Sequence, residues 1–200
     1  MFKQHFPIIL ASNSPRRKAF LSSLGLDFTV VPATIDETPF PDEGPEQFSC
    51  RMAKTKAQAI AQTHPQCCVI AADTVVTIDN NILGKPQSPE QALSFLQKLR
   101  GKMHKVITGV SLIHPTNELL FSTCTQVWFA EYPDEILQSY VQSGDPMDKA
   151  GAYGIQSFGG FLIQSIKGSY SNVVGLPVTE LVSRLTDDSI ITPADQQTPC

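Results

Sequence analysis

Short apolar runs separated by polar breaks recur along the chain, and this pattern predicts alternating strands and helices. Residues 8–11 have the length of a buried strand, and the break after them leads to Pro15, which suits the first turn of a helix. That helix is expected to stop at Gly25. Further strands are predicted at residues 28–31, 68–72, 75–78, 82–83, 106–113, 119–130 and 161–166, with turns at 79–81 and 114–117 that mark two hairpins.

Apolar positions at helical spacing predict further helices at residues 46–62, from Ser88 to Gly101, at 133–143 and at 174–185. The last of these tolerates Pro177 only in its first turn. Polar, proline-containing sequence from Thr186 onward predicts a frayed tail. We therefore expect an α/β fold in a single domain over residues 1–185, followed by a flexible tail at 186–200.

Composition narrows the classes of function. The 200 residues are 42% hydrophobic, enough for a core, and the net charge of −4 makes a general affinity for nucleic acid or for an anionic membrane unlikely. No apolar run approaches the length needed to span a bilayer, and the first residues do not resemble a signal peptide. The five cysteines have no metal-binding spacing and are expected to be reduced thiols. These features predict a cytoplasmic protein that binds neither nucleic acid nor membrane.

The junction between the first strand and the first helix is a candidate anion site. Ser14 can cap the free N–H groups at the start of the helix, where the helix dipole also attracts anions. Arg16 and Arg17 follow at once, and guanidinium groups match phosphate oxygens in pairs. A capped helix with a solvated basic first turn explains the same residues, so this fragment alone leaves both interpretations open.

Four other side chains are candidates on local grounds of their own, and of these the position of Asp73 favours a function. Asp73 is predicted at the carboxyl end of a buried strand, where open α/β sheets bind ligands. Glu37 lies in the proline-rich loop at 32–45 and could reach over a cleft, although such acids are more often solvated. Lys56 would ordinarily be a solvated helix residue, and Lys85 is equally well explained as a simple loop lysine.

Several short motifs follow one another between residues 7 and 185. They are Ser12-x-Ser14-Pro15-Arg16-Arg17, Asp36-Glu37, Lys56-Ala57, Ala72-Asp73-Thr74-Val75-Val76, Gly84-Lys85-Pro86, Asp145-Pro146-x-Asp148-Lys149-Ala150-Gly151-Ala152-Tyr153-Gly154-Ile155-Gln156 and Gly168-Ser169-Tyr170-x-Asn172-Val173-Val174-Gly175-Leu176-Pro177. This ordered set closely resembles the Maf family of nucleotide pyrophosphatases. The resemblance implies a two-lobed fold of the inosine triphosphatase-like type, with a central mixed sheet and an active-site cleft. It also implies cleavage of a nucleoside triphosphate to the monophosphate and pyrophosphate with a divalent metal, and a homodimer, which nothing in the residues decides.

Within that family the sequence is similar to the dTTP/UTP pyrophosphatase branch. Arg16, Thr74 and Gln156 occupy the positions that the family uses for substrate specificity, and all three agree with the pyrimidine branch. CTP and modified pyrimidine nucleotides remain open as further substrates. The alternatives are a 7-methyl-GTP pyrophosphatase of the same family, or a septum-formation regulator that binds nucleotide without turnover.

The resemblance and the chemistry of triphosphate hydrolysis together imply roles for the remaining candidates. Departing pyrophosphate gains negative charge, so fixed cations and donors are needed around it. The phosphate-binding residues would be Ser12, Ser14, Arg17, Lys56 and Lys85. Asp73 would take the proton of the attacking water or act mainly as a metal ligand, a choice that the sequence leaves open, and Asp73 with Glu37 would hold Mg²⁺ or Mn²⁺. A pure phosphate-binding module would not need these acids, which favours an enzyme.

Overall fold

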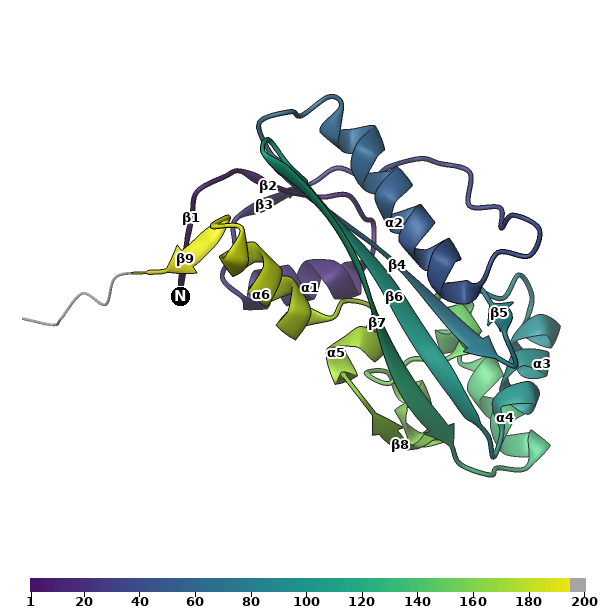
Figure 1. Cartoon of the computed structure of the whole chain (residues 1–200). Helices are drawn as coiled ribbons and strands as arrows, with labels where there is room; N and C mark the ends of the chain where they lie inside the picture. The colour runs from purple at the N-terminus through teal and green to yellow at the C-terminus, as the bar shows by residue number, and fades with distance from the viewer. Residues whose placement is uncertain (195–200) are drawn as a thin grey trace, which may run out of the picture.

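The computed structural model describes residues 1–194, in which helices flank both faces of a long mixed sheet (Figure 1). The strands are β1 (Phe2–Gln4), β2 (Ile8–Leu10), β3 (Phe28–Val30), β4 (Cys68–Ile78), β5 (Asn81–Leu83), β6 (Met103–His114), β7 (Asn117–Phe129), β8 (Ile163–Lys167) and β9 (Ile191–Pro193). The α-helices are α1 (Pro15–Ser23), α2 (Pro45–Ala61), α3 (Pro89–Leu99), α4 (Asp134–Gln142), α5 (Tyr170–Val174) and α6 (Val178–Asp187). Three 3₁₀ helices are η1 (Asp145–Asp148), η2 (Ala150–Ala152) and η3 (Phe158–Leu162).

The main sheet has the strand order β3-β2-β4-β6-β7-β8, with β5 paired to β4. Strand β2 runs parallel to both β3 and β4, whereas β4, β6, β7 and β8 pair antiparallel in succession. The predicted α/β class and mixed central sheet are confirmed. In Figure 1 the three longest strands, β4, β6 and β7, run side by side through the molecule.

One edge of β4 is shared by two short strands with a gap between them. Strand β2 pairs with residues 68–70 of β4, and β5 pairs with residues 76–78 of the same strand. Among the described strands none pairs with this edge between residues 71 and 75. Because β2 is parallel to β4 and β5 is antiparallel to it, both short strands end in their carboxyl termini at the gap. The segments that follow Leu10 and Leu83 therefore converge on one place.

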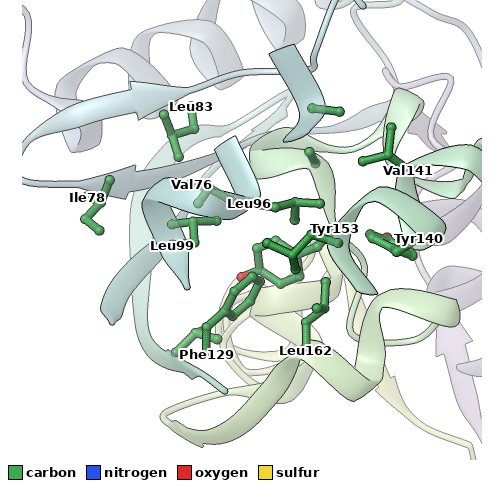
Figure 2. Close-up of a cluster of buried hydrophobic side chains, with 14 of the residues drawn as sticks. Val76, Ile78, Leu83, Leu96, Leu99, Phe129, Tyr140, Val141, Tyr153 and Leu162 are labelled. Carbon is green, nitrogen blue, oxygen red and sulfur yellow. The ribbon is translucent and has the colours of Figure 1, made fainter. Parts of the chain in front are cut away.

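Alternating side chains of β4 face different layers, as the pleat of a strand requires. Val69, Ala71 and Val75 pack against α2, whose buried residues include Met52 and Ala57. Residues on the opposite face contribute to a cluster with Leu21 of α1 and with α6, or to a second cluster with α3 and α4. Figure 2 shows this second cluster, to which Val76 of β4, Leu96, Tyr140 and Tyr153 all belong.

The predicted interruption of β4 at Asp73-Thr74 is wrong. Strand β4 continues from Cys68 to Ile78, because β6 pairs with it antiparallel over the whole stretch from Val69 to Thr77. Asp73 therefore lies in the middle of a strand rather than at its carboxyl end. The strand that ends beside it is β2, and the end of β2 is the edge that the sheet presents to a ligand.

The single helix predicted at residues 174–185 is also wrong. Gly175 has φ +126°, a conformation that side chains other than glycine rarely adopt, and Pro177 forms the N-cap of the next helix. The segment is thus divided into α5 and α6. Helix α5 begins before the predicted helix, at Tyr170, because Ser169 caps it by accepting a hydrogen bond from the backbone N–H of Asn172 at 3.2 Å.

The expected tail from Thr186 is wrong for residues 186–194. Helix α6 extends to Asp187, and β9 pairs with β1 in a two-stranded sheet. Ile190 and Ile191 are fully buried, which explains why this polar-looking segment is ordered. The rest of the predicted tail, residues 195–200, lies outside the described residues.

Cys50, Cys67, Cys68 and Cys124 are free thiols, as the sequence predicts, and Cys200 lies outside the described residues. Within residues 1–194, no helix combines the length and the apolar character that crossing a bilayer would require.

Candidate active site

The gap beside β4 gathers side chains from four segments of the chain. The segment after β2 brings Ser12, Ser14 and the start of α1, and the segment after β5 carries the exposed Lys85, for which the described residues show no hydrogen bond or ion pair with the others. Helix α2 and the loop before it bring Lys56 and Glu37. Strand β4 itself brings Asp73 and Thr74. The sheet topology therefore brings together segments that lie far apart in the sequence.

The start of α1 is organised around two serine hydroxyls. Ser14 is the N-cap, and its Oγ accepts from the backbone N–H of Arg17 at 3.5 Å. Ser12 Oγ accepts from the Ser14 backbone N–H at 3.2 Å and from the Arg17 side chain at 3.1 Å. The cap predicted from the sequence is confirmed, and Ser12 links the cap to the arginine.

Arg17 is held in one orientation by three hydrogen bonds. Its guanidinium donates to Gly175 O at 2.8 Å, to Ser12 Oγ at 3.1 Å and to Thr74 Oγ1 at 3.0 Å. A guanidinium has five N–H donors, so two remain for a ligand. Burial lowers the pKa of Arg17, opposed by the charge of Asp73, yet an arginine remains protonated in proteins.

Lys56 bridges the two predicted acids. Its Nζ lies 2.7 Å from Asp73 Oδ1 and 2.7 Å from Glu37 Oε1. The Asp73 and Lys56 side chains are largely buried, whereas that of Glu37 is 60% exposed. The neighbouring Asp36 instead accepts hydrogen bonds from Thr38, so only one member of the acidic pair reaches the site.

Burial raises the pKa of Asp73, and the nearby Glu37 adds to this effect. The charges of Lys56 and Arg17 oppose it without cancelling it. A carboxylate whose pKa is raised toward neutral pH is a better proton acceptor than an ordinary aspartate. The environment of Asp73 therefore suits a general base.

Asp73 and Thr74 point to opposite faces of β4, because they are successive residues of a strand. Asp73 faces Lys56 of α2, and Thr74 faces Arg17 of α1. The two halves of the site meet around the unpaired edge of β4. A ligand at this edge would lie between Arg17 on one side and the Asp73–Lys56 pair on the other.

The acids of the site provide the kind of ligands that a hard divalent cation uses. Within residues 1–194, no three His, Cys, Asp or Glu side chains are grouped as metal ligands. However, Mg²⁺ is usually bound by one or two carboxylates together with substrate phosphates. The Glu37 and Asp73 carboxylates converge on one cation, the Lys56 ammonium, so their donor chemistry fits such an ion.

The three positions predicted to select the base have different surroundings. Arg16 donates to Asp148 Oδ2 at 3.0 Å and to Asp148 O at 3.4 Å. Thr74 Oγ1 is bonded to Arg17 and, at 2.9 Å, to Thr108 Oγ1. Gln156 is exposed between η2 and η3, and the described residues show no direct contact that joins it to Arg16 or Thr74. Lys85 is also exposed, beside the Gly84 carbonyl that accepts from Gly151 N at 3.1 Å.

Sequence reasoning missed the residues that hold these side chains in place. Thr108 Oγ1 donates to Asn172 O at 3.3 Å, and the buried Asn172 side chain donates to Val106 O at 3.0 Å. This fixes α5 and therefore the Gly175 carbonyl that Arg17 contacts. Thr108 gives no sequence signal, because a threonine in a strand is ordinary. The acids and lysine of residues 145–149 do give one, since their charges are spaced for local ion pairs.

Comparison with known proteins gives consistent results. A model of the family described as "Maf-like protein" matches residues 7–187. The chain is 47% identical over 193 residues to a Desulfotalea psychrophila protein named dTTP/UTP pyrophosphatase, covering 96% of this chain and 99% of that protein. A Halalkalibacterium halodurans protein of the same name is 44% identical over 179 residues, covering 90% and 94% respectively.

Two solved structures share the fold at low identity. The HAM1 protein from Coxiella burnetii has a TM-score of 0.55 at 16% identity, covering 91% of this chain and 99% of that one. The Staphylococcus aureus Ham1 protein gives the same TM-score and identity, covering 92% and 99%.

Proposed function

The chain belongs to the Maf family, and from this membership we propose that it hydrolyses dTTP and UTP to the nucleoside monophosphate and pyrophosphate. The relatives named dTTP/UTP pyrophosphatase match it over most of their length at 40–47% identity. The observation that carries the proposal is the paired arrangement at β4, with the partly buried Arg17 on one face and a lysine-bound aspartate on the other. CTP and modified pyrimidine nucleotides are further candidate substrates.

Hydrolysis of a triphosphate needs both signs of charge at one place. The pyrophosphate that leaves gains negative charge, which the unused donors of Arg17, together with Lys56, Lys85 and the serines of α1, would stabilise. The attacking water must lose a proton. Asp73 would accept it, and the raised pKa of its carboxyl supports that role.

Asp73 and Glu37 would hold a divalent cation, Mg²⁺ or Mn²⁺. Such an ion lowers the pKa of a bound water and neutralises charge on the phosphates. Lys56 uses two of its three N–H donors on these acids, so one donor remains for a phosphate oxygen. The residues that we assign to the ion are the same ones that Lys56 now bridges.

Selection of a pyrimidine base would depend on Arg16, Gln156 and Thr74. Thymine and uracil offer two carbonyl acceptors on either side of one N–H donor, which requires donors and an acceptor in the protein. Arg16 supplies donors, and the Gln156 amide supplies both. A 7-methylguanine is larger and positively charged, so Arg16 would repel it.

A panel of nucleoside triphosphates tests the proposal, with release of pyrophosphate measured in Mg²⁺, in Mn²⁺ and with a chelator. We expect dTTP and UTP to be cleaved well above ATP, GTP and 7-methyl-GTP, and activity to be lost with the chelator. A panel with 7-methyl-GTP as the best substrate would move the protein to the other branch of the family. Nucleotide binding without cleavage under every condition would instead indicate a regulator.

The proposal includes a cytoplasmic location, which the four free thiols support. It also includes a homodimer, which follows from the family resemblance and is testable by light scattering.

A further inference from the structure

Lys149, in the motif between residues 145 and 156, is buried, and all three N–H donors of its ammonium are bonded within the protein. Lys149 is 8% exposed, and its Nζ donates to Asp145 O at 2.5 Å, to Asp145 Oδ1 at 3.2 Å and to Asp148 Oδ1 at 2.7 Å. An ammonium has three N–H donors, so none remains for a phosphate. The function of Lys149 must therefore be exerted through the two aspartates.

The two aspartates lead from Lys149 in different directions. Asp145 Oδ2 accepts from Tyr140 OH and from Ser157 Oγ, both at 2.7 Å. Ser157 is the residue next to Gln156. On the other side, Asp148 Oδ2 accepts from Arg16 at 3.0 Å. One connected set of hydrogen bonds thus runs from Ser157 to Arg16. It links Arg16 to the neighbour of Gln156, and both Arg16 and Gln156 belong to the proposed base-selecting residues.

The surroundings hold the Lys149 end of this set in place, whereas the Asp148 side chain is itself 60% exposed. Tyr140 packs in the apolar cluster of Figure 2, which holds the far end of the chain of contacts. Gly154 lets the Lys149 and Ser157 side chains pack closely against the backbone, because a Cβ there would lie 2.6 Å from Ser157 Oγ and 2.8 Å from Lys149 Cε. Asp148 has no spare oxygen, since one binds Lys149 and the other binds Arg16.

Arg16 depends on Asp148 for its orientation. Its side chain is 22% exposed, and its two hydrogen bonds within the described residues both go to Asp148, one to the carboxylate and one to the backbone carbonyl. A long flexible side chain held at two points keeps its remaining donors in a fixed direction. Partial burial alone would raise the pKa of Asp148, but the hydrogen bonds from Lys149 and Arg16 outweigh it and keep the pKa below its usual value. The carboxylate thus stays charged and keeps its hold on Arg16.

We propose that Asp148 is a positioning residue for base selection: held by Lys149 and Asp145, it fixes the Arg16 guanidinium at the angle needed to bind a pyrimidine. This inference rests on the proposed function, in which Arg16 contacts the base. It adds a residue that would not touch the substrate and yet would influence which base the enzyme prefers.

The test compares kcat/KM for UTP and ATP in the parent, Asp148→Asn, Arg16→Ala and the double variant. Loss of a charge-assisted hydrogen bond predicts that Asp148→Asn lowers the UTP preference roughly tenfold. It should do so mainly through KM for UTP. The double variant should be no less selective than Arg16→Ala alone, because the aspartate acts through the arginine. Glu118→Gln is the matched control, since it removes a carboxylate from the exposed Lys54–Glu118 ion pair, and it should leave the preference unchanged.

The outcomes separate this inference from the proposed function. If Arg16→Ala lowers the preference and Asp148→Asn does not, or if their effects simply add, the positioning role is rejected while the enzyme assignment stands. If Arg16→Ala leaves the preference intact, the base-selecting role of Arg16 falls, and the inference with it. Should Asp148→Asn fail to fold, Asp148→Glu keeps the charge but moves the carboxylate by one methylene. An unchanged preference in that variant would also reject the role.

Discussion

Lys56 shows how a single side chain can adjust the chemistry of its neighbour. Its ammonium lies 2.7 Å from Asp73 and lowers a carboxyl pKa that burial has raised. Without Lys56 the pKa of Asp73 would be higher, and a protonated carboxyl cannot accept a proton from water. Lys56 therefore keeps the proposed base ionised as well as binding phosphate.

Replacement of Lys56 by methionine tests this coupling. The proposed base works only when ionised, so kcat/KM falls as the pH drops through the pKa of Asp73. In Lys56→Met that pKa is higher, and the acid limb of the pH profile should move to higher pH. Lys54→Met is the control, because Lys54 lies on the same helix and pairs with Glu118 on the surface. Identical acid limbs in both variants would exclude the coupling.

Asp73→Asn tests the base itself. The amide cannot accept the proton of water, so kcat should fall by about 10²–10⁴ while calorimetry still detects nucleotide binding. Asp79→Asn makes the same chemical change in the exposed β4–β5 turn, at φ +50°, which asparagine tolerates well. A kcat for Asp73→Asn close to that of Asp79→Asn would reject the assignment.

The sequence favours a solvated position for Lys56, although the spacing of apolar residues along the helix contains a signal against that interpretation. Lys56 lies four residues after Met52 and three after Ala53, on the apolar side of α2, where a solvated lysine is not expected. Thr74 shows the limit of such arguments. Its family position suggests contact with the base, whereas its hydroxyl contacts Arg17 and Thr108, which come from segments that only the fold brings together.

At the scale of elements, α2 approaches the sheet closely because of one glycine. A Cβ on Gly109 of β6 would lie 2.5 Å from the backbone carbon of Ser49 and 2.6 Å from the backbone nitrogen of Cys50. Helix backbone cannot yield as a flexible side chain would. The position of α2, and with it Lys56, depends on the absence of a side chain at residue 109.

Gly109→Ala should therefore displace α2 and reduce both stability and activity. We expect the free energy of unfolding to fall by at least about 1–3 kcal/mol, measured by urea denaturation, with a loss of kcat. Gly84→Ala is the control for stability, since a Cβ there meets no atom within 4 Å, and its change should stay within about 1 kcal/mol. Equal stability of the two variants would contradict this account of the packing.

Element types followed well from the sequence, but two boundaries did not. The polar pair Asp73-Thr74 looked like a strand end because a sequence cannot show that β6 pairs along that whole stretch. The helix expected across Gly175 and Pro177 is divided because Gly175 has φ +126° and Pro177 forms the N-cap of α6, and Arg17 binds the Gly175 carbonyl. In both places contacts between distant segments override the local pattern.

At the scale of the whole molecule, the pairing of β1 with β9 joins the two ends of the described chain. Ile191 of β9 is fully buried in the cluster that also contains Leu10 and Leu21 of the β2–α1 unit. The segment that the sequence presents as a tail thus supports the unit that carries Arg17. Its burial could not be foreseen, because the partner strand is nearly 190 residues away along the chain.

Ile191→Ala should cost about 2–5 kcal/mol of unfolding free energy, as expected for truncation of a buried isoleucine. Ile136→Ala, at a half-exposed position of α4, should change it by no more than about 0.5 kcal/mol. Chemical denaturation of both variants gives the comparison. A loss at Ile191 no larger than that at Ile136 would show that β9 contributes little.

The three long strands β4, β6 and β7 cross the molecule without a break, so the layers on either side share one continuous ladder (Figure 1). We therefore expect that local unfolding cannot separate one half of this sheet from the other. The amide protons of these strands should exchange with deuterated water together, at the slow rate set by unfolding of the whole sheet. Those of the loop that carries Glu37, residues 31–44, should exchange far sooner, because it belongs to no strand or helix. We expect the sheet to stay rigid while Glu37, which pairs with Lys56, moves faster than the other residues of the site.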